Sequence, residues 1–133
     1  MERLKLRYAS AERALNTLTE ILKEPFSVVV RDAAIQRFEY TFEAVWKLVR
    51  EYLREVQGIV CVSAKSCLRS AMSVGLLTEE ETIGALEMVD DRNLTSHTYH
   101  EEVAQKIFNK LPDYSRIMSL LLERMRQNAS LLS

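Results

Sequence analysis

The chain has 133 residues, of which 47% are hydrophobic and 28% charged, with a net charge of −1 at pH 7. This length is enough for one domain with a hydrophobic core, so we expect residues 1–133 to form a single domain. The near-zero net charge excludes an overall basic field, and any nucleic-acid site must therefore be local. Three glycines and two prolines are few, which favours long helices joined by short connections.

The two cysteines, Cys61 and Cys67, belong to no CxxC motif and to no Cys/His ligand set. We therefore expect both to be reduced thiols of an intracellular protein. No apolar run approaches about 18 residues and the N-terminus is charged, so the sequence predicts no signal peptide and no membrane span. The expected location is the cytoplasm. No phosphate-binding loop, zinc motif or paired-carboxylate motif is present, so we expect no cofactor and no metal.

The first half of the chain predicts two long helices. In residues 3–23, apolar side chains recur at steps of three and four. They are Leu4, Tyr8, Ala11, Leu15, Leu18 and Leu22. Pro25 ends this helix, and a second helix is expected over about 27–57, closed by Gly58. Its apolar stripe consists of Ile35, Phe38, Phe42, Val45, Val49, Tyr52 and Val56. Trp46 lies beside the stripe, which indicates either a wide core face or a second face that contacts another subunit.

Two shorter helices are expected next. Residues 58–62 are apolar and β-branched, but a lone strand has no partner, so we expect an ordered loop. A helix over about 64–74 has Ser63 as its N-cap and Gly75 at its C′ position. Thr78 and Glu81 then form a capping box that begins a fourth helix. This fourth helix should turn a set of apolar side chains inward, namely Ile83, Leu86 and Val89.

The last third of the chain predicts a fifth helix over 99–110 and a sixth over 112–127. Pro112 either begins the sixth helix or kinks the fifth. The tail, residues 128–133, is expected to fray. Together these elements predict an all-α fold, an antiparallel up-and-down bundle of four to six helices.

The densest polar stretch is residues 90–99 (DDRNLTSHTY), between the fourth and fifth helices. Five residues turn a helix by about 500°, so Arg92 and His97 on one continuous helix would point roughly 140° apart. They converge only if the helix ends between them. Asn93 is a tolerable last residue, and Thr98 with the glutamate three residues later reads as a capping box for the next helix.

An arginine and an imidazole beside a helix N-terminus form a reasonable phosphate site. Local chemistry alone leaves a structural alternative open. In that alternative His97 bonds a nearby carbonyl, and Arg92 pairs with Asp90 or Asp91.

Two stretches together point to a known family. Residues 31–42 (RDAAIQRFEYTF), followed by 44–47 (AVWK), open the second helix, and residues 91–99 (DRNLTSHTY) close the fourth. In this order they resemble the HEPN superfamily, in its branch of nucleotidyltransferase substrate-binding proteins, to which HepT-like toxins of toxin–antitoxin modules are related. Arg-x4-His alone is a weak pattern, whereas Arg-x4-His-x-Tyr combined with the first stretch is specific. The resemblance covers nearly the whole chain.

This resemblance implies a homodimer in which two Arg-x4-His motifs face each other across a cleft. Arg92 and His97 match the ribonuclease motif of the family, and Asn93 matches the polar residue that follows the arginine. Tyr99 matches the tyrosine that the partner enzyme modifies with AMP in the toxin branch. The implied partners are therefore a cognate small nucleotidyltransferase, which acts as the antitoxin, and an RNA substrate.

The chemistry of RNA cleavage agrees with these residues. Without a metal, the reaction needs a base for the ribose 2′-hydroxyl, an acid for the leaving 5′-oxygen and a cation for the phosphorane. Two copies each of His97 and Arg92 in a dimer are sufficient for these roles. The 2′-hydroxyl requirement selects RNA over DNA. The competing function is a non-catalytic subunit that binds a substrate or nucleotide for the nucleotidyltransferase.

Five further polar residues carry expectations. Arg31, Gln36 and Glu39 belong to the first resembling stretch, and they either form a salt-bridge network that fixes the bundle or line the dimer cleft. His100 is expected to be a solvated residue in the first turn of a helix. The hydroxyl of Tyr99 is expected to be at least partly exposed, because other side chains of its helix already occupy the inward stripe.

Overall fold

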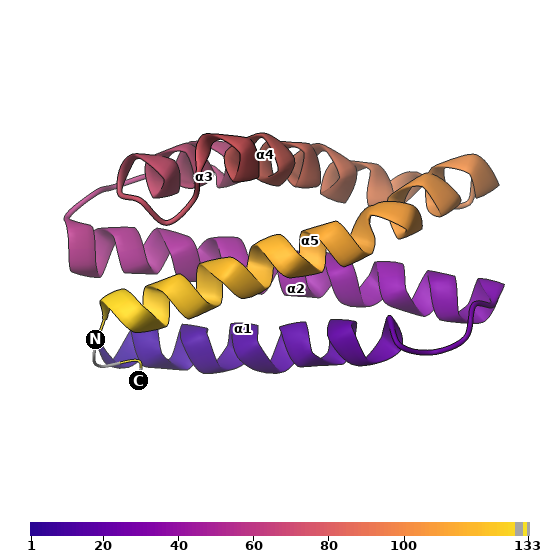
Figure 1. Cartoon of the computed structure of the whole chain (residues 1–133), viewed down its shortest axis with the longest axis horizontal. Coiled ribbons are helices and arrows are strands. Elements are labelled where there is room, and N and C mark those ends of the chain that lie inside the picture. Colours follow the sequence, from indigo (N-terminus) through magenta and orange to yellow (C-terminus); the bar gives the residue numbers. More distant parts are fainter. Residues whose placement is uncertain (130–131, 133) are drawn as a thin grey trace.

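The computed structural model describes residues 1–129 and 132, and these form five α-helices and one short 3-10 helix, with no strand among them (Figure 1). In chain order they are α1 (Glu2–Ile21), α2 (Val28–Gln57), α3 (Ala64–Ser73), α4 (Glu79–Leu94), η1 (Thr95–His97) and α5 (Glu101–Asn128). The all-α fold expected from the sequence is confirmed. Residues 58–62 form a loop, also as expected.

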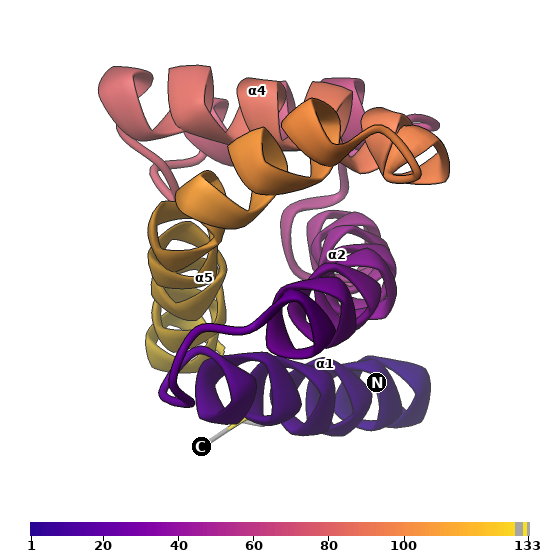
Figure 2. The ribbon, with the colours of Figure 1, turned by 90° about the vertical axis from the view of Figure 1, so that its right-hand side faces the viewer.

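The long helices α1, α2, α4 and α5 run alternately in opposite directions (Figure 1). Seen along the long axis, α1, α2, α5 and the layer of α3 and α4 surround a common core (Figure 2). The largest side chains that are almost fully buried there include Tyr52, Phe38, Leu4, Leu18, Met88, Ile107 and Met118. Both termini lie at one end of the bundle, and the elbow between α4 and α5 lies at the other (Figure 1).

The capping residues fix several helix ends where the sequence places them. Gly58 and Gly75 follow α2 and α3 with φ angles of 67° and 82°, in the left-handed region that glycine adopts without strain. The hydroxyl of Ser63 accepts a hydrogen bond from the backbone N–H of Ser66 at the start of α3. Thr78 forms the expected capping box with the carboxylate three residues later, at the start of α4.

The carboxylate of that capping box also joins α4 to α5. Arg124 donates two hydrogen bonds to Glu81, at 2.6 and 3.1 Å, and a third to the carbonyl of Leu76 at 2.9 Å. The bonds from Arg124, together with the backbone N–H of Thr78, lower the pKa of Glu81 to about 2. Glu81 is therefore ionised throughout the neutral range and acts as both a cap and a clamp.

The expectation of two reduced thiols is wrong, because Cys61 and Cys67 form a disulfide in this structure. Cys61 lies in the α2–α3 loop and Cys67 in the first half of α3. The chain turns back at the loop, so the two Cα atoms lie 5.2 Å apart, within the range that a disulfide requires. Pairing depends on this separation and not on a CxxC spacing, which is why the sequence did not indicate it.

Helix α5 is one continuous helix that contains Pro112, so the kink is the correct alternative and a separate sixth helix is not formed. Figure 2 shows the helix changing direction between its first and second halves. Proline lacks the N–H that would bond the carbonyl of Phe108, and its ring crowds that turn. The helix ends at Asn128. Ala129 and Leu132 are buried, whereas the rest of the expected fraying tail (130, 131 and 133) lies outside the described residues.

One inward-facing residue of α4 is predicted wrongly. Ile83 is 63% exposed, while the face of α4 that packs on the bundle includes the polar residues Thr82 and Asp91. Apolar spacing alone misses this face, because both polar side chains are hydrogen-bonded inside the protein. The Thr82 hydroxyl donates to the carbonyl of Thr78 at 2.7 Å, and the Tyr114 hydroxyl donates to Asp91.

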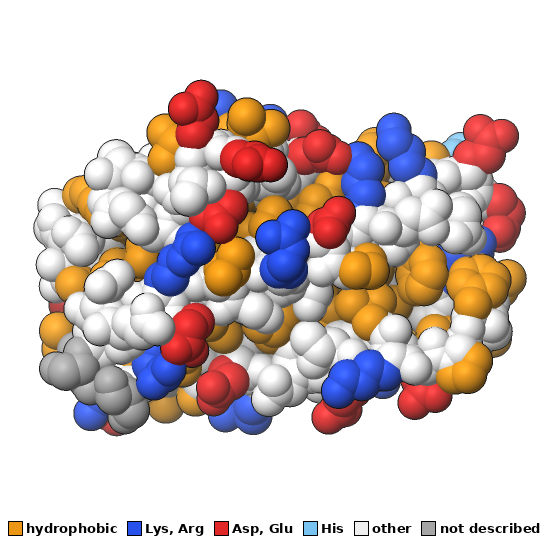
Figure 3. Space-filling view, in the orientation of Figure 1, with side chains coloured by type: hydrophobic (Ala, Val, Ile, Leu, Met, Phe, Trp, Pro, Cys, Tyr) orange, Lys and Arg blue, Asp and Glu red, His pale blue; other side chains and the backbone are white. Residues whose placement is uncertain are grey.

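The surface agrees with the small net charge of the chain. Acidic and basic side chains are interspersed over the face that Figure 3 shows. No helix within the described part of the chain is long and apolar enough to cross a membrane.

Candidate functional site

The elbow between α4 and α5, residues 92–101, separates Arg92 from His97 by a helix end. Helix α4 stops at Leu94, one residue beyond the expected end, and η1 carries the chain through His97. Helix α5 begins at Glu101, two residues later than expected. Arg92 therefore lies on the last turn of α4 and His97 at the end of η1, so the two side chains are not fixed on opposite faces of one helix.

The capping box expected at the start of α5 is not formed. The Thr98 hydroxyl donates to the carbonyl of Thr95 at 3.2 Å, and His100 is the N-cap residue without a side-chain cap. The carboxylate of Glu101 instead accepts two hydrogen bonds from Arg31, at 2.7 and 3.1 Å. Leaving a buried guanidinium without a counter-charge costs more free energy than leaving one backbone N–H without a cap. Glu101 therefore pairs with Arg31 and does not cap the helix.

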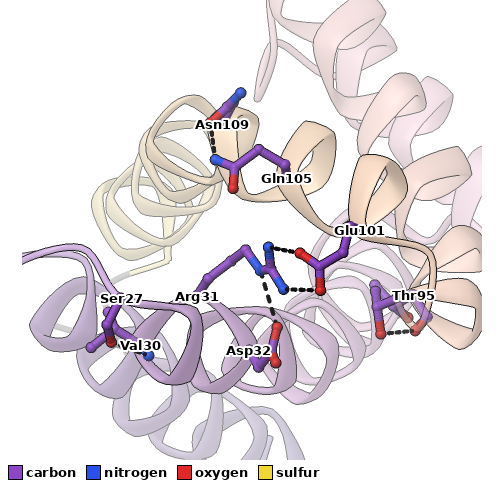
Figure 4. Close-up of polar contacts among 9 residues, drawn as sticks. Ser27, Val30, Arg31, Asp32, Thr95, Glu101, Gln105 and Asn109 are labelled. Carbon is purple, nitrogen blue, oxygen red and sulfur yellow. Dashed lines mark hydrogen bonds and ion pairs between the residues drawn. The ribbon is translucent and has the colours of Figure 1, made fainter.

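Arg31 joins the start of α2 to the start of α5 (Figure 4). Its side chain is almost fully buried, and it also contacts Asp32 at 3.1 Å. The hydrogen bond from Arg31 lowers the pKa of Glu101, and the same bond raises the pKa of Arg31. Of the two roles considered for Arg31, these contacts favour the network that fixes the bundle.

Arg92 points from α4 towards α2. Its guanidinium donates to the hydroxyl of Thr95 at 3.1 Å, and it lies 3.6 Å from Glu43 and 3.9 Å from Glu39. These carboxylate distances are longer than a good hydrogen bond, so they are loose ion pairs. The Nε atom of Arg92 is shielded from solvent and makes no hydrogen bond among the described residues.

Arg92 pairs with neither Asp90 nor Asp91, the two partners considered in the structural alternative. Asp90 pairs with Lys65 at 2.7 Å, and Asp91 is buried beside Tyr114. In that alternative the acidic partner of Arg92 lies on its own helix, whereas in the structure its partners come from α2. Spacing along the chain could not identify Glu43, because the pairing depends on how α4 crosses α2.

His97 and Tyr99 occupy the outer side of the elbow. His97 is exposed, and its Nδ1 atom lies 3.5 Å from the Tyr99 hydroxyl. Tyr99 is 72% exposed, and its ring centroid lies 4.3 Å from that of His100, which is also exposed. Both exposure predictions are confirmed. Asn93 and Gln36 are exposed as well.

Two cavities help to locate the site. One of about 420 Å³ adjoins the elbow along the first residues of α5, His100 to Val103. Another, of about 530 Å³, lies between α4 and α5 away from the elbow, and several of its charged groups are already paired with one another, such as Lys110 with Glu87. Among residues 1–129 and 132, no group of His, Cys, Asp and Glu side chains is suited to hold a metal. The elbow is exposed to solvent at His97 and Tyr99, which lie next to each other. Arg92 is partly buried, points to the carboxylates of α2, and forms no hydrogen bond with His97 or Tyr99 among the described residues.

Comparison with known proteins identifies the family of this chain. The sequence profile described as nucleotidyltransferase substrate binding protein like matches residues 6–127. A Haemophilus influenzae protein named "Probable ribonuclease HepT" is 34% identical over 98 residues, which are 71% of this chain. The match spans 66% of that relative, slightly less than two thirds of its length.

Solved structures agree with the profile. A crystal structure of a Thermus thermophilus protein has a TM-score of 0.84 at 56% identity, over 87% of this chain and 98% of that one. A Haemophilus influenzae structure, described as the fold of a substrate-binding domain of a nucleotidyltransferase, has a TM-score of 0.65 at 27% identity, over 95% and 98% of the two chains.

A tri-AMPylated HEPN toxin of Shewanella oneidensis, in complex with its MNT antitoxin, has a TM-score of 0.64 over 91% of this chain and 98% of that one. At 16% identity it shows that the fold is shared. Because the family profile covers most of the chain, this protein belongs to the nucleotidyltransferase substrate-binding protein-like family.

Proposed function

We propose that this chain is the HEPN subunit of a two-component module with a small nucleotidyltransferase, and that it is a metal-independent endoribonuclease of the toxin type. The observation that supports this proposal is that Arg92, His97 and Tyr99 belong to one elbow between α4 and α5, on which His97 and Tyr99 are exposed and adjacent. The relative named as a HepT ribonuclease and the toxin bound to its antitoxin support the same function.

In the proposed reaction, one His97 removes the proton of a ribose 2′-hydroxyl, and the 2′-oxygen attacks the neighbouring phosphorus. A second His97 gives a proton to the 5′-oxygen as the P–O5′ bond breaks. The products are a 2′,3′-cyclic phosphate and a free 5′-hydroxyl. Arg92 holds the phosphate by a forked contact and stabilises the charge of the phosphorane, with Asn93 as a further polar contact.

The long ion pairs of Arg92 suit this role. Glu39 and Glu43 orient the guanidinium at 3.6 to 3.9 Å without binding it tightly. A phosphate would replace them by shorter, charge-assisted hydrogen bonds. In this account Glu39 and Gln36 border the cleft, whereas Arg31 supports it from behind through Glu101.

The alternative is a non-catalytic subunit that presents a substrate or nucleotide to the nucleotidyltransferase. One observation favours it, since Glu39 and Glu43 beside Arg92 weaken the attraction of the elbow for RNA phosphates. The Haemophilus influenzae structure described as a substrate-binding domain points the same way.

Cleavage of RNA in the presence of EDTA separates the two functions. We expect the purified protein to cut RNA without added metal and to leave 5′-hydroxyl ends. His97→Ala should reduce the rate by roughly 10² to 10⁴, because it removes the proton-transfer group. His100→Ala is the matched control and should keep the rate. Failure of the parent protein to cut a wide panel of RNAs would favour the binding subunit.

Assembly into a two-fold homodimer is required, because one chain supplies a single His97. Trp46 on α2 is half-buried, and its Nε1 donates to Glu43, the residue that also faces Arg92. An aromatic side chain that bonds to the same carboxylate as Arg92 supports a subunit contact in this region. Sedimentation velocity at micromolar concentration should give the mass of a dimer. A stable monomer under these conditions would rule out a site that two subunits share.

Modification of Tyr99 is the proposed control of the site. AMP on its hydroxyl, 3.5 Å from the Nδ1 atom of His97, would bring a negative phosphate that competes for Arg92 with the RNA phosphate. Incubation with the cognate nucleotidyltransferase, ATP and magnesium should add mass increments of AMP that map to Tyr99 and abolish cleavage. Tyr99→Phe should not be modified, whereas Tyr40→Phe, which removes another exposed tyrosine, should be modified like the parent. Equal modification of both variants, or full activity of the modified parent, would show that this switch is wrong.

A further inference from the structure

A cluster of arginines lies towards the end of the bundle that is opposite the elbow (Figure 1). Arg3 and Arg7 on the first turns of α1 meet Arg50 and Arg54 on the last turns of α2. Together with Glu51 and the α2–α3 loop at Val60 they enclose a cavity of about 270 Å³, which we call the arginine cavity.

The charges around the arginine cavity are not balanced by the side chains that the structure describes. Glu51 is the one acidic side chain among the described residues that line it, and this carboxylate accepts a hydrogen bond from Arg54 at 2.7 Å. Arg3, Arg7 and Arg50 form no ion pair with any carboxylate in the part of the chain that the structure describes. Three guanidinium groups around one cavity repel each other, and a bound anion would relieve that repulsion.

Two of these arginines are also placed for binding. The Nε of Arg7 is shielded from solvent and has no hydrogen-bond partner among the described residues. Buried polar groups normally have a partner, so the protein leaves this donor of Arg7 unsatisfied beside the cavity. The guanidinium carbon of Arg50 lies 4.9 Å from the ring centroid of Trp46. Stacking on an aromatic ring holds a guanidinium in place and leaves its N–H groups for a forked contact.

The arginine side chains that line the cavity indicate an anionic ligand with several oxygen atoms. Several forked donors around a compact cavity match the geometry and the charge of phosphate. A neighbouring cavity of about 310 Å³ shares Arg3 and Arg7 and adds the side chains of Leu6 and Ala44, which offer an apolar surface for a ribose or base. We propose that the arginine cavity binds the phosphate groups of a nucleotide or of an RNA strand. This site is separate from the elbow and does not rest on the proposed cleavage.

Isothermal titration calorimetry at low salt tests the proposal with three probes, namely pyrophosphate, ATP and a 5′-phosphorylated RNA decamer. The titrated proteins carry His97→Ala, so that no probe is cut. Arg7→Gln and Arg50→Gln should each weaken binding by about tenfold, the effect of losing one charge-assisted contact. Arg13→Gln removes an exposed arginine from the same helix, and it should bind like the parent. A thermal unfolding measurement verifies that each variant is folded. If Arg7→Gln does not fold, Arg50→Gln still tests the cavity.

The three probes distinguish the source of the phosphate. Binding of pyrophosphate and ATP that is weakened only by the cavity variants indicates a nucleotide. The same pattern with the decamer but not with ATP indicates an RNA strand. The proposal is overturned if the parent binds none of the probes, or if Arg13→Gln and the cavity variants bind them equally. Each of these results is independent of whether the unsubstituted protein cleaves RNA.

Discussion

The ion pair between Arg31 and Glu101 is the interaction on which the elbow depends. Arg31 lies in the first turn of α2, where the helix dipole disfavours a cation, and it is almost completely buried. Glu101 lies in the first turn of α5, where the dipole favours an anion. The pair joins residues 70 positions apart, and it places the start of α5 against the start of α2. Without Glu101, a buried guanidinium would keep only the neighbouring Asp32 as counter-charge.

The arrangement of the elbow follows from this pair. Glu101 pairs with Arg31 and is not available to Thr98. The Thr98 hydroxyl instead donates to the carbonyl of Thr95, and the chain leaves α4 through a 3-10 turn. That turn leaves Tyr99 exposed beside His97 and places Arg92 between Thr95 and the carboxylates of α2. The proposed catalytic groups thus lie on a segment held at both ends, by α4 on one side and by the pair with α2 on the other. The arginine cavity is a separate cationic region, built by the termini of α1 and α2.

Local patterns predicted most of the helices, because helix periods and caps are properties of short segments. The capping residues at 58, 63, 75 and 78 act within three or four positions, and the structure has each of them. Predictions from the sequence were wrong where a residue distant in the chain takes part in the interaction. Glu101 bonds to Arg31 and so does not form the expected capping box with Thr98. Glu43 lies beside Arg92 because the packing of α4 on α2 brings these two residues together. The disulfide likewise depends on the path of a loop, which residue spacing does not determine.

The elbow clamp is tested most directly by amide hydrogen exchange of the folded protein with Glu101→Gln, compared with Glu102→Gln. Glu102 is an exposed carboxylate in the same turn of α5, so it controls for charge near the helix N-terminus. The account predicts faster exchange at residues 95–104 in Glu101→Gln alone, with amides in the middle of α1 unchanged, because only the elbow loses its attachment. Equal exchange at the elbow in the two variants would contradict the claim that Arg31 and Glu101 hold the site in place.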